Sequence, residues 1–205
     1  MTLELFHHPF SRAANVVWML EEVGLPYTLR FVDLRAGEQK TSLVTHHNPM
    51  GKLPVLIDGD AVVTETAAIG VYLADRHAPG RLAPALDDPQ RGTFLRWAFY
   101  APSVVEPGCA AKAAGWEGRA SSLGWGTYEA MLDTLDVGLG EGPWLLGERF
   151  TMADVILGAT LRWMLGFKMI EPRDRFVAYA ERLAARPALQ RADARNAEVR
   201  AAHGL

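Results

Sequence analysis

Strand-type patterns in this sequence are confined to its first third. Apolar and polar residues alternate at 2–6 and 27–34, and two apolar, β-branched runs flank an Asp-Gly pair at 55–64, which is typical of strands and of a hairpin. Apolar residues recur at helical spacing near 16–23 and again at 65–77, and a short, weakly patterned helix is expected before the hairpin. Beyond this point the spacing favours helices alone, separated by Gly and Pro. We therefore expect an α/β region with the order βαβα and then ββα, followed by an all-helical region.

A proline-rich segment separates these two regions. The stretch APGRLAPALDDP carries three of the twelve prolines of the chain, and proline interrupts both helices and strands. We predict an α/β domain at 1–77, a linker at 78–87 and an all-α domain at 88–205. The Ala- and Arg-rich tail after Pro187 is expected to fray, because chain ends have few neighbours to hold them.

Composition and charge exclude several classes of protein. With 49% hydrophobic and 22% charged residues among 205, the chain has the composition of a globular protein. Its net charge of −3 is small and the signs are interspersed, so it has no electrostatic footprint for nucleic acid or an anionic membrane. No apolar run approaches the ~18 residues of a spanning helix, and the first residues lack a secretory pattern. We expect a cytoplasmic protein.

Redox chemistry and metal binding by the side chains are not expected. Cys109 is the only cysteine, which excludes an intrachain disulfide, a dithiol pair and a multi-cysteine zinc site. We expect Cys109 to be a small core residue rather than a nucleophile. The pairs His7-His8 and His46-His47 lack an acidic or cysteine partner at ligand spacing, and neighbouring strand residues face opposite sides. The sequence therefore predicts no metal site.

Pro54 lies inside an apparent strand, in the stretch NPMGKLPVLIDGD. Proline has no N–H to donate to a sheet ladder. It therefore marks an edge or the start of a strand, or else a cis bond that shapes the backbone for another use. If the bond is cis, the main-chain groups of Leu53 turn outward at the sheet end and can pair with an extended peptide. This segment is a candidate peptide-binding edge.

Glu65 and Thr66 fall at the start of the third predicted helix, in TETAAIGVYL. Unpaired N–H groups and the positive end of the helix dipole favour a carboxylate at such a position. Thr66 can add a hydroxyl donor to that carboxylate and Glu65 can pair with an ammonium group, so together they suit the zwitterionic head of an amino acid. Taken alone, the pattern fits a structural alternative better, in which Thr64 caps the helix and Glu65 complements its dipole.

Three motifs in this order, NPMGKLPVL, TETAAIGVYL and ERFTMADVILGA, resemble the cytosolic glutathione S-transferase family, and LRFVDLRAGEQK is similar to its theta-like branch. The resemblance covers nearly the whole chain and implies a thioredoxin-like domain joined to an all-helical one. It also implies that Pro54 is cis and that Leu53, the residue before it, binds the cysteinyl backbone of glutathione. The pair Glu65 and Thr66 matches the Glu-Ser/Thr pair that holds the γ-glutamyl head. Lys52 and Gln39 match two side chains near the glycyl carboxylate.

The segment FTMAD within the third motif has a structural interpretation of its own. Thr151 can cap a helix while Asp154 reaches back to the backbone as a capping-box acid, and Phe150 and Val155 can form the hydrophobic staple. The resemblance implies that this element nucleates a buried helix, so none of it is assigned to the active site.

The loop HHPFSR is the candidate for thiol activation. A free thiol has a pKa of about 8.5, which helix N-termini and hydrogen-bond donors lower. Ser11 lies where the first helix begins, and the similarity to theta-like members implies that its hydroxyl donates to the glutathione sulfur. Two alternatives stay open: Ser11 only caps the helix, or Arg12 or the N–H of Ala13 acts instead. No Tyr or Cys occupies the loop, which disfavours disulfide exchange through a protein cysteine.

The resemblance implies a homodimeric transferase of the detoxification type that uses glutathione as co-substrate, without a metal, and directs its thiolate at a hydrophobic electrophilic small molecule. Alternatives are a glutathione-dependent isomerase or peroxidase on the same site, or a non-catalytic interaction module, which has no need of an amino-acid head pocket. The electrophile should meet an apolar surface where the helical domain faces the Ser11 loop, with only two or three aromatic side chains lining it. The candidates are Phe10, Trp97, Tyr100, Val104, Trp116, Trp163 and Phe167.

Overall fold

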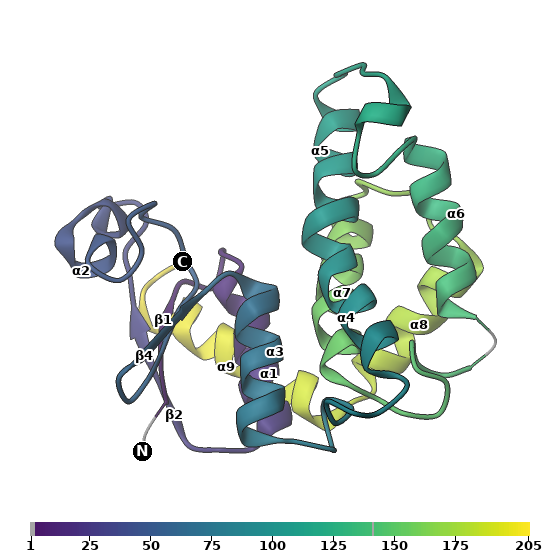
Figure 1. Cartoon of the computed structure of the whole chain (residues 1–205). Helices are drawn as coiled ribbons and strands as arrows, with labels where there is room; N and C mark the ends of the chain where they lie inside the picture. Colours follow the sequence, from purple (N-terminus) through teal and green to yellow (C-terminus); the bar gives the residue numbers. More distant parts are fainter. Residues whose placement is uncertain (1–2, 141) are drawn as a thin grey trace. The chain divides into compact units, whose positions relative to one another are not determined.

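The computed structural model describes residues 3–140 and 142–205, and its backbone contacts divide the chain into two compact units. The first unit contains the chain up to His77 together with Arg186–Leu205, and the second is Ala78–Ala185. Figure 1 labels the elements of both units in the order of the sequence. The final segment, which the sequence analysis assigned to the helical domain, thus groups with the α/β unit.

The first unit is built on a four-stranded mixed sheet with the strand order β2-β1-β3-β4. β1 pairs in parallel with β2 and antiparallel with β3, and β3 pairs antiparallel with β4. The predicted thioredoxin-like arrangement is therefore confirmed. The strands are β1 Leu3–His7, β2 Tyr27–Phe31, β3 Val55–Asp58 and β4 Ala61–Thr64, and the helices are α1 Ala13–Val23, α2 Ser42–Thr45, α3 Thr66–His77 and α9 Pro187–Ala202, with a 3-10 turn at Glu38–Lys40.

Local sequence signals account for most of these bounds. α1 ends at Gly24, whose φ of 80° is the left-handed C-cap conformation that glycine adopts without a steric cost. β3 and β4 join through a two-residue loop in which Gly59 has a φ of 60°, the backbone that a tight hairpin requires. Phe6, Val32, Val44 and Val55 form a buried cluster that packs the segment around α2 against the sheet.

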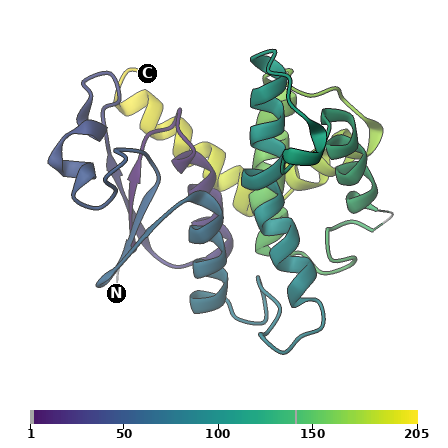
Figure 2. The same cartoon turned by 45° about the horizontal axis from the view of Figure 1, so that its top comes forward.

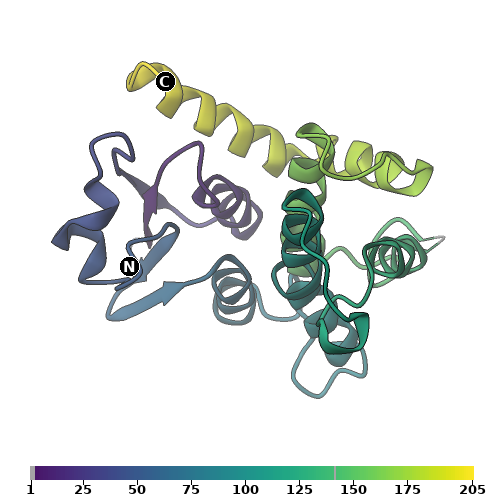
Figure 3. The same ribbon diagram turned by 90° about the horizontal axis from the view of Figure 1, so that it is seen from above.

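The last helix is ordered up to Ala202 and packs against α1 (Figure 3), so the expectation that the tail frays is wrong. Its small and apolar side chains at Ala188, Leu189 and Ala192 are buried. The Arg186 guanidinium donates two hydrogen bonds, of 2.7 and 2.8 Å, to the carboxylate of Glu22 on α1. The helix is held because alanine permits close packing and these ionic contacts anchor it, although its sequence shows little amphipathic patterning.

The second unit is all-helical, as predicted. Its first two helices are continuous through a π-helical segment at Ala101–Val105, and Figure 2 shows them as one extended rod. π-helical turns inside α-helices are rare and frequently accompany functional sites. No helix in the described ranges is both long and apolar enough to cross a membrane. The α-helices are α4 Arg91–Tyr100, α5 Glu106–Ala113, α6 Tyr128–Leu139, α7 Met152–Gly166 and α8 Asp174–Ala184.

The predicted capping box starts α7, the most buried helix of this unit. The Thr151 N–H donates to Asp154 Oδ2 at 2.8 Å, and the Thr151 side chain accepts from the backbone of Asp154. Asp154 also accepts hydrogen bonds from the Leu145 N–H, at 2.9 Å, and from the Tyr179 hydroxyl, at 2.9 Å. The carboxylate therefore ties α7 to the preceding loop and to α8, which confirms its structural role.

Candidate active site

The pairing register of the sheet brings three of the predicted segments to one end. His7 at the end of β1 is opposite Phe31 at the end of β2, while Val55 at the start of β3 is paired with Thr64 at the end of β4. The loop after β1, the segment before β3 and the start of α3 all leave the sheet at this end, because antiparallel neighbours meet where one begins and the other finishes. This is the candidate site.

The bond between Leu53 and Pro54 is cis, as the resemblance implied. Pro54 is buried and precedes the first ladder residue, Val55, so its missing N–H removes no strand pairing. Leu53 is half-buried and packs against the buried cluster that contains Val44 and Val55. In the part of the chain that the structure describes, neither its N–H nor its C=O has a protein hydrogen-bond partner. These two groups are available to an extended ligand.

Glu65 enters α3 in an unusual backbone conformation. Its φ is 67°, in the left-handed region that a non-glycine residue rarely adopts, and its C=O accepts the first helical hydrogen bond, from Ile69 N–H at 2.9 Å. Its side chain is exposed, and among the described residues it has no ion pair or hydrogen bond. Thr64, by contrast, ends β4. A strained residue with an unused carboxylate is more typical of a binding site than of a simple helix start.

Thr66 is the first residue of α3 and is half-exposed. The N–H groups of the first helical turn have no partner within the helix, and they carry the positive end of its dipole. An anion placed here can accept from these N–H groups and from the Thr66 hydroxyl. The Glu65 and Thr66 pair thus offers a cation-binding carboxylate next to an anion-binding helix start.

Gly51 brings the segment before β3 close to the backbone of Gln39. A Cβ atom at Gly51 would lie 2.5 Å from the Gln39 carbonyl oxygen, and the φ of Gly51 is 58°, so glycine is required for this close approach. Nearby, Lys40 Nζ donates to the Met50 carbonyl at 2.8 Å, while Lys52 is exposed. The backbone of Gln39 therefore lies next to the residue that precedes Lys52, and a shared contact of the two side chains with a carboxylate stays a prediction.

Ser11 lies in a tight turn between β1 and α1 that its own hydrogen bonds close. Its hydroxyl donates to the His8 carbonyl at 2.8 Å and accepts from the Ala13 N–H at 3.2 Å. The Ser11 N–H also donates to the His8 carbonyl, at 3.0 Å, and the Phe10 N–H donates to His8 Nδ1 at 3.2 Å. We call residues 8–13 the Ser11 turn. In this conformation the single hydroxyl proton of Ser11 is already used.

Comparison with known proteins identifies the family. The N-terminal domain model of glutathione S-transferase matches residues 1–75, and the C-terminal domain model matches residues 119–191. Human glutathione S-transferase theta-2B is 31% identical, with 90% of this chain and 82% of that protein covered. The chain belongs to the glutathione S-transferase family.

Solved structures of transferases agree with this membership. A glutathione transferase from Methylococcus capsulatus str. Bath superposes with a TM-score of 0.79 at 30% identity, covering 95% of this chain and 98% of that one. A family member from Pseudomonas fluorescens Pf-5, solved with two glutathione molecules bound, has a TM-score of 0.77 at 27% identity, covering 93% of this chain and 91% of that one. The two-unit fold is thus the fold of this enzyme family.

Arg12 stands at the N-cap position of α1 in this transferase, with its side chain half-buried. The predicted cap residue, Ser11, lies one position earlier and still binds the Ala13 N–H. Ser11 thus supports the helix start from one position before the cap, while the choice of Ser11, Arg12 or the Ala13 N–H as the activating donor stays a prediction.

Sequence reasoning missed the residues that hold the Ser11 turn from outside. His7 Nε2 lies 2.7 Å from Asn196 Oδ1 on α9, and both side chains are buried. The ring of His8 packs 5.5 Å from that of Phe31, which stacks on His203 at 3.6 Å. The histidine pair was considered only for metal binding, and its contacts with the last helix leave no signal at short range in the sequence.

The predicted electrophile-pocket residues occupy different surroundings. Phe10 is 64% exposed and belongs to the Ser11 turn. Trp97 is buried against Gly138 of α6, where a Cβ atom would lie only 2.0 Å from its ring, and the Tyr100 hydroxyl donates to the Met131 carbonyl at 3.1 Å. Val104 is half-buried in the π-helical segment. Within the helical unit, Trp97 and Tyr100 are thus used to pack α4 on α6.

Other predicted aromatic residues form separate pairs. Trp163 lies near the end of α7 and contacts Phe167 with ring centroids 4.9 Å apart. Trp116 is 57% exposed and contacts Trp125 at 5.8 Å, in the loop after α5. The two pairs lie on different segments of the unit, and their contact with an electrophile stays a prediction.

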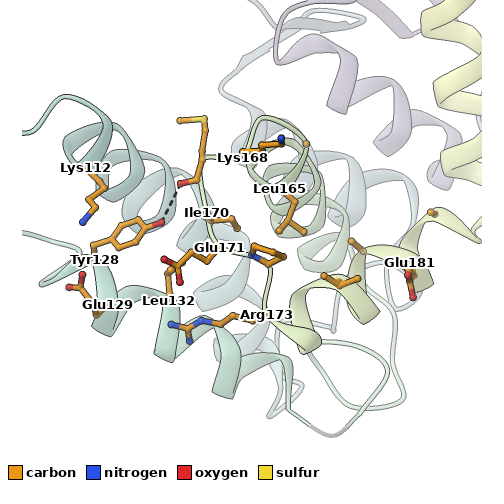
Figure 4. A pocket seen from close by; sticks show the side chains of 16 residues that line it. Lys112, Tyr128, Glu129, Leu132, Leu165, Lys168, Ile170, Glu171, Arg173 and Glu181 are labelled. Carbon is orange, nitrogen blue, oxygen red and sulfur yellow. Dashed lines mark hydrogen bonds between the residues drawn. The ribbon is translucent and has the colours of Figure 1, made fainter.

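An open pocket of about 990 Å³ lies on the helical unit, between α6, the end of α7 and α8 (Figure 4). Leu132, Leu165 and Ile170 form much of its apolar wall, and the Tyr128 hydroxyl at its edge donates to the Met169 carbonyl at 3.2 Å. Among the described residues, none of the predicted electrophile-pocket side chains lines it. It is therefore distinct from the surface that the sequence analysis assigned to the electrophile.

Cys109 is buried in α5, and burial raises the pKa of its thiol to about 11. At neutral pH it is a protonated core residue, since only the thiolate is an effective nucleophile. In the described part of the chain no three His, Cys, Asp or Glu side chains form a cluster that could hold a metal ion. The buried Cys109 thiol is thus a packing residue of α5.

Proposed function

We propose that this transferase binds glutathione along the strand end that carries the Ser11 turn and that it conjugates the thiolate to hydrophobic electrophiles. The observation that supports this most is the joint presence, at one sheet end, of an unpaired Glu65 carboxylate, an open helix start and an unbonded main-chain edge at Leu53. A zwitterionic head group attached to an extended peptide requires these three features together.

The binding mode follows from the groups that are free. The Glu65 carboxylate pairs with the α-ammonium of the γ-glutamyl residue, and the Thr66 hydroxyl and the first N–H groups of α3 bind its carboxylate. The cysteinyl residue pairs with the main chain of Leu53 as an added strand does. Lys52, which follows Gly51, and Gln39, whose carbonyl oxygen lies close to Gly51, bind the glycyl carboxylate at the other end of the peptide.

Thiol activation is assigned to the Ser11 hydroxyl after it rotates away from the His8 carbonyl. Breaking that 2.8 Å hydrogen bond has a net cost of about 1 kcal/mol, which a charge-assisted bond to a thiolate offsets. The Ala13 N–H keeps donating to the same oxygen and so polarises the hydroxyl toward the sulfur. Arg12 and the Ala13 N–H itself are the alternative donors, and both already take part in other interactions.

The chemistry of the proposed enzyme is nucleophilic substitution or addition by sulfur. The S–H bond of glutathione breaks with loss of the proton to solvent, and the thiolate forms a bond to the electrophilic carbon while the leaving group or an added proton balances the charge. Fixed donors near the sulfur and the proximity of a bound electrophile supply the rate enhancement. Exposed Phe10, in the Ser11 turn, gives the apolar surface nearest to the sulfur position.

The first experiment is a titration of the purified protein with glutathione, following binding heat and the ultraviolet absorbance of the thiolate between pH 5.5 and 9, for wild type and Ser11→Ala. We expect thiolate below the solution pKa of about 8.5 in wild type, with less thiolate at equal binding in the variant. Unchanged absorbance in the variant would assign activation to Arg12 or the backbone.

Two other outcomes would redirect the assignment. Absence of binding at millimolar glutathione would make the chain a non-catalytic module with a transferase fold. Binding and thiolate formation without conjugation, but with turnover of a peroxide or of an isomerisable substrate in a panel, would favour the isomerase or peroxidase alternative. Homodimer formation, implied by the resemblance, is measured on the same sample by light scattering.

A further inference from the structure

Asn196 on α9 makes hydrogen bonds to the two residues that flank the Ser11 turn, His7 and Ala14. Its Oδ1 lies 2.7 Å from Nε2 of His7, the last residue of β1, and its Nδ2 donates to the carbonyl of Ala14, in the first turn of α1, at 3.3 Å. Asn196 is 6% exposed and His7 is fully buried. One buried amide therefore bridges the residues that flank the turn on either side.

The direction of these hydrogen bonds follows from the amide. Because the Asn196 NH2 group donates to a carbonyl, its oxygen is the acceptor for the histidine, so His7 Nε2 carries the proton. Burial lowers the pKa of His7 to about 4, and the ring is neutral at neutral pH. His7 Nδ1 is buried without a partner, which leaves the bond to Asn196 as the only polar contact of the ring in the described structure.

The hydrogen bonds within the Ser11 turn do not reach His7. They join His8 to Phe10 and Ser11, and Ser11 to Ala13 and Ala14. Asn196 of α9 links His7 to Ala14, and His203, directly after α9, stacks at 3.6 Å on Phe31, which packs against His8. A residue more than 180 positions later in the chain thus connects the two residues that flank the turn.

We propose that Asn196 is a positioning residue for thiol activation: by bridging His7 and Ala14 it holds the Ser11 turn in the shape that aims the Ser11 hydroxyl at the glutathione sulfur. The functional part of this inference rests on the proposed role of Ser11. The bridge itself is a property of the protein without any ligand, so it is tested separately from glutathione chemistry.

The test compares three variants of the full chain with wild type. Asn196→Ala removes both hydrogen bonds, and Asn196→Asp keeps an acceptor for His7 but removes the donor to Ala14. Leu189→Ala is the control, because it removes a buried apolar side chain of α9 without touching the bridge. Thermal unfolding measures how much each substitution lowers the stability of the protein, so that effects on the turn can be compared between variants of similar stability.

Amide hydrogen exchange without glutathione tests the bridge. We expect Asn196→Ala to increase exchange at Ser11 and Ala13 at least tenfold, and Leu189→Ala to change these two amides less than threefold at a similar loss of thermal stability. If both variants change the two amides equally, or if neither changes them, Asn196 has no positioning role, whatever the protein does with glutathione.

Glutathione titration then tests the consequence for the thiol. We expect Asn196→Ala to raise the pKa of bound glutathione by about one unit and to reduce turnover about tenfold, with the dissociation constant unchanged within twofold. Adding Ser11→Ala should cause no further loss, because both changes act through one hydroxyl. Fully additive losses in the double variant would overturn the inference, while absence of thiolate in wild type would overturn the proposed role of Ser11 and leave the exchange result standing.

If Asn196→Ala fails to fold, Asn196→Asp supplies the same test. It retains an oxygen next to His7, so we expect it to fold and to show the increased exchange at Ala13 with a smaller change at Ser11. Exchange at Ala13 like that of wild type in this variant would contradict the proposed bridge to Ala14.

Discussion

The two ends of the proposed glutathione site use their polar groups in opposite ways. At the head-group end, the Glu65 carboxylate and the hydroxyl of Thr66 have no protein partner among the described residues. At the thiol end, the Ser11 hydroxyl is used twice, by the His8 carbonyl and by the Ala13 N–H. The head-group end is open to a ligand as it stands, whereas the thiol end is closed on itself.

This difference indicates that glutathione binding and activation of its thiol depend on different groups of the protein. Free groups on a rigid helix start give affinity without rearrangement, because no internal hydrogen bond has to be broken. A donor held by the protein until the thiol arrives contributes to the chemical step rather than to binding. Changes at the first end should therefore act on the dissociation constant, and changes at the second on thiolate formation and on the stability of the turn.

The largest expected effect is at the thiol end and concerns pH. Burial lowers the pKa of His7 from 6.5 to about 4, so between these values the unfolded chain binds a proton that the folded protein excludes. The contribution of neutral His7 to the free energy of unfolding is therefore fully present above pH 6.5. It is lost as the pH falls toward 4, by about 2–3 kcal/mol between pH 7.5 and 4.5. Denaturant unfolding at these two pH values should show most of this loss removed in His7→Gln.

A histidine at an exposed site provides the control for that measurement. His46→Gln should leave the loss of stability between the two pH values as it is in wild type, since His46 is exposed on α2's C-terminal side. If the His7→Gln variant loses as much stability between the two pH values as wild type does, the His7 ring is not the group that makes stability depend on pH in this range.

The next effect is at the head-group end. Glu65→Gln removes the charge that pairs with the ligand ammonium but keeps the shape of the side chain, so glutathione affinity should fall about 10- to 100-fold, or roughly 1.5–3 kcal/mol. The turnover rate at saturating glutathione should change less than threefold. Asp60→Asn is the matched control, because Asp60 is exposed in the hairpin turn at the other end of the sheet.

Equal losses of affinity in Glu65→Gln and Ser11→Ala would remove the distinction between the two ends. Calorimetric titration of both variants with glutathione makes this comparison directly. The opposite result, a loss of turnover in Glu65→Gln with unchanged affinity, would assign the carboxylate to the chemical step.

A smaller effect is expected at Thr66. Thr66→Val keeps the branched shape and the helix N–H groups but removes one hydroxyl donor, so affinity for glutathione should fall about fivefold, or roughly 1 kcal/mol. Thr93→Val, at an exposed position in the first turn of α4, is the control. An unchanged dissociation constant in Thr66→Val would mean that the backbone of α3 binds the carboxylate alone.

The smallest effect separates strain from binding at Glu65. At a φ of 67°, a residue with a Cβ atom raises the free energy of the folded state by about 1 kcal/mol, whereas glycine adopts this conformation without that cost. Glu65→Gly should therefore unfold at a higher temperature than Glu65→Ala, while both lose the same affinity for glutathione. A Glu65→Gly variant less stable than Glu65→Ala would show that the left-handed backbone stores no strain.

Much of the fold was predictable from local signals. The hairpin was indicated by Asp58-Gly59 and the start of α7 by the pair Thr151 and Asp154, both of which the structure confirms. These signals succeed because turn and cap geometry depend on a few neighbouring residues. The fraying expected after Pro187 was wrong because α9 gains its order from packing on α1, which lies far away in the sequence.

In the candidate site, too, local motifs were predictable from the sequence and the contacts of individual side chains were not. Sequence motifs pointed to Leu53, Glu65 and Thr66, and the register of the strands explains why they share one end of the sheet. The sequence alone did not show that the Ser11 hydroxyl is held by His8, since a loop of five residues has many conformations. Nor did it show that Trp97 and Tyr100 pack on α6, because helical spacing does not reveal which neighbour a side chain meets.

By itself, the sequence determined the secondary structure order and the family, and it predicted which residues bind an amino-acid head group, because each depends on short motifs with a local physical cause. Only the tertiary structure decided that residues 186–205 belong with the sheet and that Asn196 reaches His7 and Ala14. The reason is that a buried hydrogen bond between distant segments is selected by packing, which sets two side chains within 3 Å without leaving any periodic pattern in either segment.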